Sequence, residues 1–359
     1  MFRTAFVTAL VALAVAAPAG AASWERLAPG YGAYTLDTIG SGGELVFAGH
    51  ERPLACEEPE ADFLDDALFE TCLRAATASQ DCQAVGCHLY RLAADGTVHR
   101  IAEPGDGFGF YDVRVSADGT RMAAVAVNGG RSSDTSHLST MNLDGSSSRV
   151  QAVTGFTAGT APIGRSGFLA GAGQGRLFRA ADTGGFRAVK GPSSCVIYRV
   201  STDGPRTLVT GYAGTFVLSH DRRSARRIGP GGEALWVSRD GRTIALAASV
   251  SAGRDVRMLV SRNGGTSWSS TPISDATGED AAPARFIVGE IDGSSAGDLW
   301  AAGGRRDEPA ARVWKFNGSS WERVEAPNPE GPHPFSDVAV GEPGRPVVSS
   351  LQGIFELEG

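Results

Sequence analysis

The side chains that could carry chemistry lie in short segments spread along the chain. Asp112 and Asp337 each open a segment of the form Asp-Val-x-Val, so two matching carboxylates precede two apolar runs. Other polar segments carry arginine beside an acidic residue, a tyrosine or a histidine. Arginine and aromatic side chains are the groups that macromolecular interfaces use most. The candidate binding set consists of Tyr111, Asp112, Arg131, Arg254, Asp255, Arg305, Arg306, His333 and Asp337.

Sequence motifs of zinc hydrolases and of phosphate-binding loops are absent. There is no His-Glu-x-x-His pair and no glycine loop followed by lysine. The six histidines are scattered, so a metal cluster would have to be assembled by the fold, and His333 is the best candidate for a lyase that uses one histidine. We expect no metal and no cofactor. A protein without catalytic activity is favoured over an enzyme.

Composition limits the classes of partner. The 359 residues are 42% hydrophobic and 20% charged, which is typical of a folded globular chain. The formal net charge of −7 argues against a general binder of nucleic acid, which needs a basic face. A protein or glycan partner is the remaining expectation, and we expect the chain to be a monomer.

The N-terminus and the cysteines indicate export. Residues 1–21 read as a secretory signal, with Arg3 before an apolar stretch and a small-residue cleavage site at 19–21. We therefore expect a periplasmic or extracellular protein, and no later segment is apolar for long enough to span a membrane. Four of the five cysteines lie within 32 residues, which in an exported chain favours disulfides over a zinc site. The expected pairs are Cys56–Cys87 and Cys72–Cys82, one of three possible pairings, with Cys195 left as a free thiol.

A repeated hairpin supplies the elements that must position these residues. Asp-Gly and other glycine-rich turns precede short apolar strands seven times, and a second set of hairpin turns recurs between Asp95 and Asn317 at about 44 residues. Four short strands in about 44 residues is the spacing of a β-propeller blade. Residues 23–29 nearly repeat residues 320–327, so the N-terminal strand can complete the last blade. The sequence predicts an all-β, seven-bladed β-propeller over residues 22–359; six blades and a separate module are the alternative.

Two sets of turns resemble those of known propeller families. The segment Ser261-Arg262-Asn263-Gly264-Gly265-Thr266-Ser267-Trp268 resembles the Asp-box, or BNR repeat, of sialidase-like propellers, with Asn263 in the place of the usual aspartate. The segments at 115–119 and 237–241 are similar to the Ser-x-Asp-Gly turns of TolB-type, WD40-like propellers. The resemblance implies that Ser261, Asn263, Gly265 and Trp268 form a structural turn on an outer hairpin. The arginine motif of sialidases is absent.

Residues 51–86 interrupt the first repeat between its second and third strands. Pro59 among acidic residues, followed by apolar residues at helical spacing, predicts a short helix inside this disulfide-bonded insertion. Insertions into repeats tend to mark the binding face. We therefore expect a recognition or scaffold protein that binds through the loop face carrying the insertion, although exposed loops are polar in any case. The alternative is a propeller glycoside hydrolase or lyase.

Overall fold

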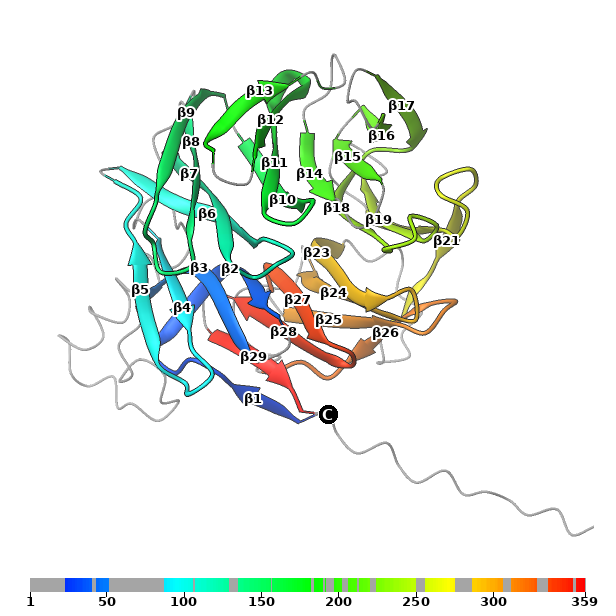
Figure 1. Cartoon of the computed structure of the whole chain (residues 1–359). Coiled ribbons are helices and arrows are strands. Elements are labelled where there is room, and N and C mark those ends of the chain that lie inside the picture. The colour runs from blue at the N-terminus through cyan, green and yellow to red at the C-terminus, as the bar shows by residue number, and fades with distance from the viewer. Residues whose placement is uncertain are drawn as a thin grey trace, which may run out of the picture.

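The chain forms seven sheets, each with four antiparallel strands, arranged as blades around a central channel (Figure 1). The seven-bladed β-propeller that the repeats predict is therefore confirmed. The computed structural model describes residues 23–358 except 41–42, 52–86, 106, 129–134, 156, 182–183, 190, 192–196, 202–205, 212, 220–223, 250–255, 275–285, 306–310, 328–334 and 351–352. Within this part of the chain, no helix is long and apolar enough to cross a membrane.

Each blade runs outward from an innermost strand. Blade one contains β2 (Tyr31–Ile39), β3 (Glu44–Glu51), β4 (His88–Leu92) and β5 (Val98–Ala102). Blade two contains β6 (Phe108–Val115), β7 (Arg121–Asn128), β8 (Thr135–Asn142) and β9 (Arg149–Thr154). Blade three contains β10 (Thr157–Ile163), β11 (Gly167–Ala172), β12 (Arg176–Ala180) and β13 (Phe186–Val189), with the 3-10 turn η2 (Gly173–Gly175).

The remaining blades follow the same order. Blade four contains β14 (Ile197–Ser201), β15 (Thr207–Gly211), β16 (Gly214–Leu218) and β17 (Ala225–Gly229). Blade five contains β18 (Gly232–Val237), β19 (Ile244–Ser249), β20 (Val256–Ser261) and β21 (Ser269–Thr271). Blade six contains β23 (Phe286–Ser295), β24 (Asp298–Arg305), β25 (Ala311–Phe316) and β26 (Trp321–Val324), with β22 (Ile273–Ser274) added parallel to β26. Blade seven contains β27 (Asp337–Glu342), β28 (Arg345–Ser350), β29 (Gly353–Leu357) and β1 (Trp24–Arg26).

The N-terminal strand closes the ring, as its similarity to the outer strand of blade six predicts. β1 pairs antiparallel with β29, placing Trp24 opposite Leu357 and Arg26 opposite Phe355. In Figure 1 the blue strand β1 lies beside the red strand β29. The first and last described strands thus share one sheet, and β1 supplies the outer neighbour of β29.

Local turn chemistry explains why the strands stop where they do. In the β6–β7 turn, Ser116 Oγ donates to Asp118 Oδ1 at 2.7 Å, and Gly119 takes a φ of +65°. In the β18–β19 turn, Ser238 Oγ donates to Asp240 Oδ1 at 2.6 Å in the same way. The aspartate fixes the turn through its own short side chain, and glycine accepts the left-handed backbone that follows.

The turn between β20 and β21 is held by its own side chains. Ser261 Oγ accepts a hydrogen bond from Gly265 N at 2.8 Å, and Asn263 Oδ1 accepts one from Ser267 N at 2.9 Å. Gly265 has a φ of +85°, which glycine adopts without strain. Trp268 Nε1 donates to the carbonyl oxygen of Ile228 in blade four at 2.7 Å. This segment acts as a structural turn on an outer hairpin.

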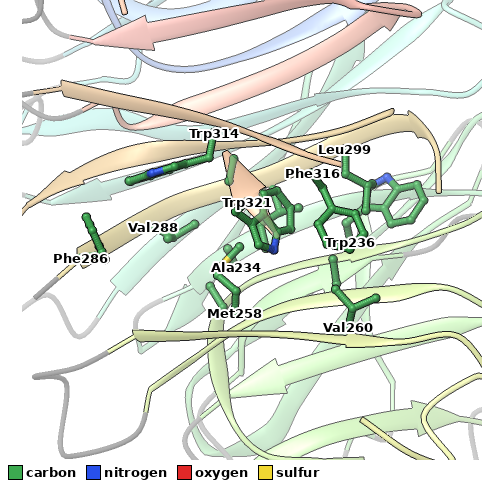
Figure 2. Close-up of a cluster of buried hydrophobic side chains, with 14 residues drawn as sticks. Ala234, Trp236, Met258, Val260, Phe286, Val288, Leu299, Trp314, Phe316 and Trp321 are labelled. Carbon is green, nitrogen blue, oxygen red and sulfur yellow. The ribbon is translucent and has the colours of Figure 1, made fainter. Parts of the chain in front are cut away.

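The hydrophobic core is divided into layers between neighbouring blades. Figure 2 shows the layer between blades five and six, where Trp236, Trp314 and Trp321 pack with Phe286 and Met258. Successive residues of a strand face opposite sides, so each blade contributes one set of apolar side chains to each neighbour. Apolar contacts between the facing sides of neighbouring blades therefore hold the ring together.

The expected helix in the 51–86 insertion lies outside the described residues, as do Cys56, Cys72, Cys82 and Cys195. Within the described residues, the single helical segment is the 3-10 turn η2. Cys87, at the end of the insertion, is fully buried and disulfide-bonded. Its pairing stays a prediction.

Candidate functional site

A β-bulge at the same place in six innermost strands sets which side chains face the channel. The bulge interrupts the pairing with the second strand in β2, β6, β10, β14, β18 and β23. A bulge bends its strand and redirects the side chains that follow. The first residue after the bulge is Thr35 in β2, Asp112 in β6 and Glu290 in β23. Two residues further on, on the same side of each strand, stand Asp37, Arg114 and Asp292.

Four carboxylates in the channel accept hydrogen bonds from the innermost strand of the next blade. Asp112 Oδ2 accepts from Thr160 N at 2.7 Å, and Asp337 Oδ2 accepts from Leu36 N at 3.1 Å. In the same way, Asp37 Oδ2 accepts from Val115 N at 2.6 Å, and Asp292 Oδ2 accepts from Val340 N at 2.8 Å. We call these four contacts the inter-blade carboxylate bonds; they join blades six, seven, one, two and three in series.

Arg114 lies at the centre of this arrangement. Its guanidinium donates to Glu290 Oε2 at 2.8 Å and to Asp337 Oδ2 at 3.3 Å, and Asp112 Oδ1 is 3.8 Å away. It also donates to the carbonyl oxygen of Leu36 at 2.9 Å. One arginine of blade two thus contacts blades six, seven and one. Burial opposes its charge, but the surrounding carboxylates, Asp337 first, outweigh burial and raise the pKa of Arg114 well above its ordinary value.

Two carboxyl groups of the channel hold their protons more strongly than an ordinary aspartate. Burial raises the pKa of Asp37 to about 6, although Arg114 and two backbone N–H groups oppose the rise. Burial raises the pKa of Asp292 to about 7, against hydrogen bonds from Val340 and Gly293. Groups with such pKa values can give or take a proton near neutral pH.

A cavity of about 520 Å³ lies beside these groups. Its lining includes Asp37, Arg114, Asp292 and Trp236, together with residues of the turns β6–β7, β10–β11 and β18–β19. Those turns join first to second strands, so the cavity reaches the end of the channel where they lie. The insertion joins the second to the third strand of blade one, which puts it at the opposite end. Among the described residues, no group of three or more histidine, cysteine, aspartate or glutamate side chains could hold a metal ion.

The structure brings together part of the predicted binding set. Asp112 and Asp337 meet around Arg114, and Tyr111 occupies the bulge of β6, its ring 4.8 Å from that of Tyr34. Arg305 is the last residue of β24. The other members, which are Arg131, Arg254, Asp255, Arg306 and His333, lie outside the described residues. The role of the set in binding therefore stays a prediction.

Sequence reasoning missed four residues of the channel: Asp37, Arg114, Glu290 and Asp292. Each is a charged residue at an alternate position of an otherwise apolar innermost strand. Aligning the seven innermost strands would have shown charges facing the same way as Asp112 and Asp337. Which of them meet could not be read from the strands one at a time, because Arg114 and Glu290 come from blades on separate parts of the ring.

Comparison with known proteins identifies the fold. No protein-family model matches the chain, and no curated protein matches it. Among solved structures, a chain of a mitotic checkpoint complex aligns with a TM-score of 0.60 and 12% identity, covering 100% of this chain and 98% of that one. A streptogramin B lyase aligns with a TM-score of 0.60 and 10% identity, and the alignment covers 94% of this chain and 97% of the lyase.

A glycoside hydrolase family 74 xyloglucanase from Xanthomonas campestris aligns with a TM-score of 0.61 and 13% identity. The alignment covers 93% of this chain and 53% of the xyloglucanase. At such low identities these likenesses show the fold alone. The chain is a seven-bladed β-propeller that resembles both enzymes and a component of a protein complex.

Proposed function

We propose that this protein is an exported recognition or scaffold propeller without catalytic activity. It binds a protein or glycan partner through the loop face that carries the 51–86 insertion. The observation that carries this proposal is the use of the channel carboxylates. Four of them accept backbone hydrogen bonds between blades, and the fifth, Glu290, pairs with Arg114. Groups that hold the ring together are poorly placed to change partners during a reaction.

The foot of the insertion supports the choice of face. Tyr90 packs against Phe47 with ring centroids 5.2 Å apart and meets Tyr31 edge-on at the same distance. Arg100 pairs with Glu51, the first residue of the insertion and the one that the structure describes at this end, at 2.9 Å. A buried aromatic cluster gives the insertion a rigid base. A rigid base favours a binding role, because less conformational freedom is lost when a partner is captured.

A pull-down tests this proposal. Residues 57–85 are replaced by a short Gly-Ser turn, and circular dichroism checks that the propeller is folded. We expect partner recovery from native envelope extract to be lost. Charge reversal at Arg254 and Arg305 should weaken recovery too, more at low ionic strength, where charges act over longer distances. Undiminished recovery by the folded deletion variant would place the site elsewhere.

One observation favours a second candidate, a propeller glycoside hydrolase or lyase. Asp37 and Asp292 both line the 520 Å³ cavity and have raised pKa values, as a general acid requires. A panel of aryl glycosides and polysaccharides tests it. Turnover that Asp292→Asn abolishes without unfolding the protein would support the enzyme and contradict a purely structural channel.

A further inference from the structure

Positive charge is concentrated in blades three and four. Between residues 157 and 229 there are eleven arginine and lysine residues and three acidic residues, a formal net charge of +8. The whole chain has a net charge of −7, so the remainder carries −15. The negative net charge of the whole chain conceals this uneven distribution. Blades three and four thus form a basic part of the ring.

Three of these arginines lie on the sides of the two outer hairpins that face the neighbouring blade. We use the word groove for the space between these hairpins, β12–β13 of blade three and β16–β17 of blade four. In β12, Arg179 alternates with Phe178 and so shares a face with Leu177, which packs in the layer between blades three and four. Arg187 of β13 pairs directly with Arg179 and lies on the same face. From blade four, Arg227 pairs with Phe216, which belongs to that same layer.

Within the described part of the chain, these three arginines have no acidic partner. All three are exposed, and among the described residues none of them forms an ion pair. Arg227 Nε donates to the carbonyl oxygen of Gly229 at 3.2 Å. Like charges placed directly opposite on neighbouring strands destabilise a sheet, and Arg179 and Arg187 are such a pair. An anionic ligand would relieve this repulsion.

The floor and edges of the groove indicate the kind of ligand. Its apolar floor includes Val189, Phe216 and Ala225, which pack against the layer and remain partly exposed. Among the described strands, β13 and β17 are the outermost of their sheets, so each has one edge without a described neighbouring strand. An extended peptide can hydrogen-bond to such an edge, place apolar side chains on the floor and offer carboxylates to the guanidinium groups. A phosphorylated or sulfated glycan would use the charges alone.

We propose that the groove between the outer hairpins of blades three and four binds an acidic, extended segment of a protein partner. The groove lies on the circumference of the ring, away from the loop face assigned above. The two surfaces can therefore be tested separately. Charge attracts the segment, and the apolar floor with the free strand edges selects a polypeptide over other polyanions.

The test uses a fluorescent peptide that alternates glutamate with valine, followed by anisotropy. We expect binding by the wild-type protein and weakening of about tenfold or more in the double variant Arg179→Glu/Arg187→Glu. The matched control, Arg149→Glu/Arg226→Glu, makes the same change in net charge on exposed arginines of β9 and β17 outside the groove. It should change binding by about twofold or less. A peptide with glutamine in place of glutamate should bind neither protein.

The remaining outcomes each decide against the proposal. No binding of the acidic peptide by wild type, or equal weakening in both double variants, would show that the groove is not a peptide site. Dextran sulfate binding that depends on Arg179 and Arg187, without peptide binding, would assign the groove to an anionic glycan. If the reversal variant does not fold, Arg179→Gln with Arg187→Gln replaces it. That variant removes the like-charge pair, and its stability should equal or exceed that of the wild type.

Discussion

Replacing Arg114 with methionine tests the role assigned to the channel. The substitution keeps much of the side-chain volume and removes the cation that Glu290 and Asp337 contact at 2.8 and 3.3 Å. The arginine side chain is 16% exposed and the two carboxylates are less so. Removing one partner of a buried ionic network leaves uncompensated charges, which costs about 3–5 kcal/mol. We expect a loss of that size in the free energy of unfolding near neutral pH.

The loss should depend on pH with a definite sign. Without Arg114, the carboxylates left around its position repel one another while ionised, and protonation removes that repulsion. The folded variant therefore binds protons more readily than wild type, so its relative stability falls as pH rises. Urea unfolding followed by tryptophan fluorescence, near pH 5 and near pH 8, should show the larger loss at the higher pH.

Arg345→Met is the matched control. Arg345 also contacts two carboxylates, Glu342 at 3.1 Å and Glu356 at 2.6 Å, but its side chain is 41% exposed. Exposed ion pairs contribute about 1 kcal/mol or less. If Arg114→Met and Arg345→Met lower stability equally, or if the loss in Arg114→Met does not vary with pH, the reasoning about a buried ionic centre is refuted.

Three further predictions concern the rest of the ring. Because burial raises the pKa of Asp292 to about 7, the folded state keeps a proton that the unfolded state releases above about pH 4, and this group lowers stability as pH rises towards 7. Asp292→Asn, which can still accept from Val340 N, should raise the free energy of urea unfolding near pH 8, on the order of 1.4 kcal/mol for each unit of pKa, and leave it unchanged near pH 4. A difference that does not vary with pH would contradict this. Deleting residues 22–29 removes β1 and the hydrogen bond from Trp24 Nε1 to the carbonyl oxygen of Glu325, so the melting temperature should fall sharply; a melt within about two degrees of wild type would show that closure does not need β1. Thiol titration of the unfolded, unreduced protein should find one free thiol, Cys195, and four or five would rule out the expected disulfides.

The sequence predicted the blades because their signals are local. Turns such as Asp118-Gly119 end a strand through contacts within five residues, so each turn can be recognised from its own short segment. Ring closure was predictable for a different reason: Trp24 and Trp321 stand in near-identical segments that form equivalent outer strands. The channel was not predictable in the same way. The contact between Arg114 and Glu290 spans 176 residues, and only the curvature of the whole ring brings them together.

Two kinds of side-chain hydrogen bond join neighbouring blades in the described residues, and one interface of the ring differs from the others because it has neither kind. Tryptophan Nε1 groups on or beside outer strands reach back to the preceding blade at three successive interfaces: Trp268 to Ile228 O, Trp321 to Thr271 Oγ1 and Trp24 to Glu325 O. The inter-blade carboxylate bonds cover the interfaces from blade six round to blade three.

The interface between blades three and four can form neither kind of bond. Strands β10 and β14 contain no acidic residue, and β13 and β17 contain no tryptophan. This seam is held by its apolar layer, with Arg179, Arg187 and Arg227 above it. A ligand that bridges the two outer hairpins there would supply the cross-link that the other interfaces already have. The proposed acidic segment should therefore stabilise the protein against unfolding as well as bind to it.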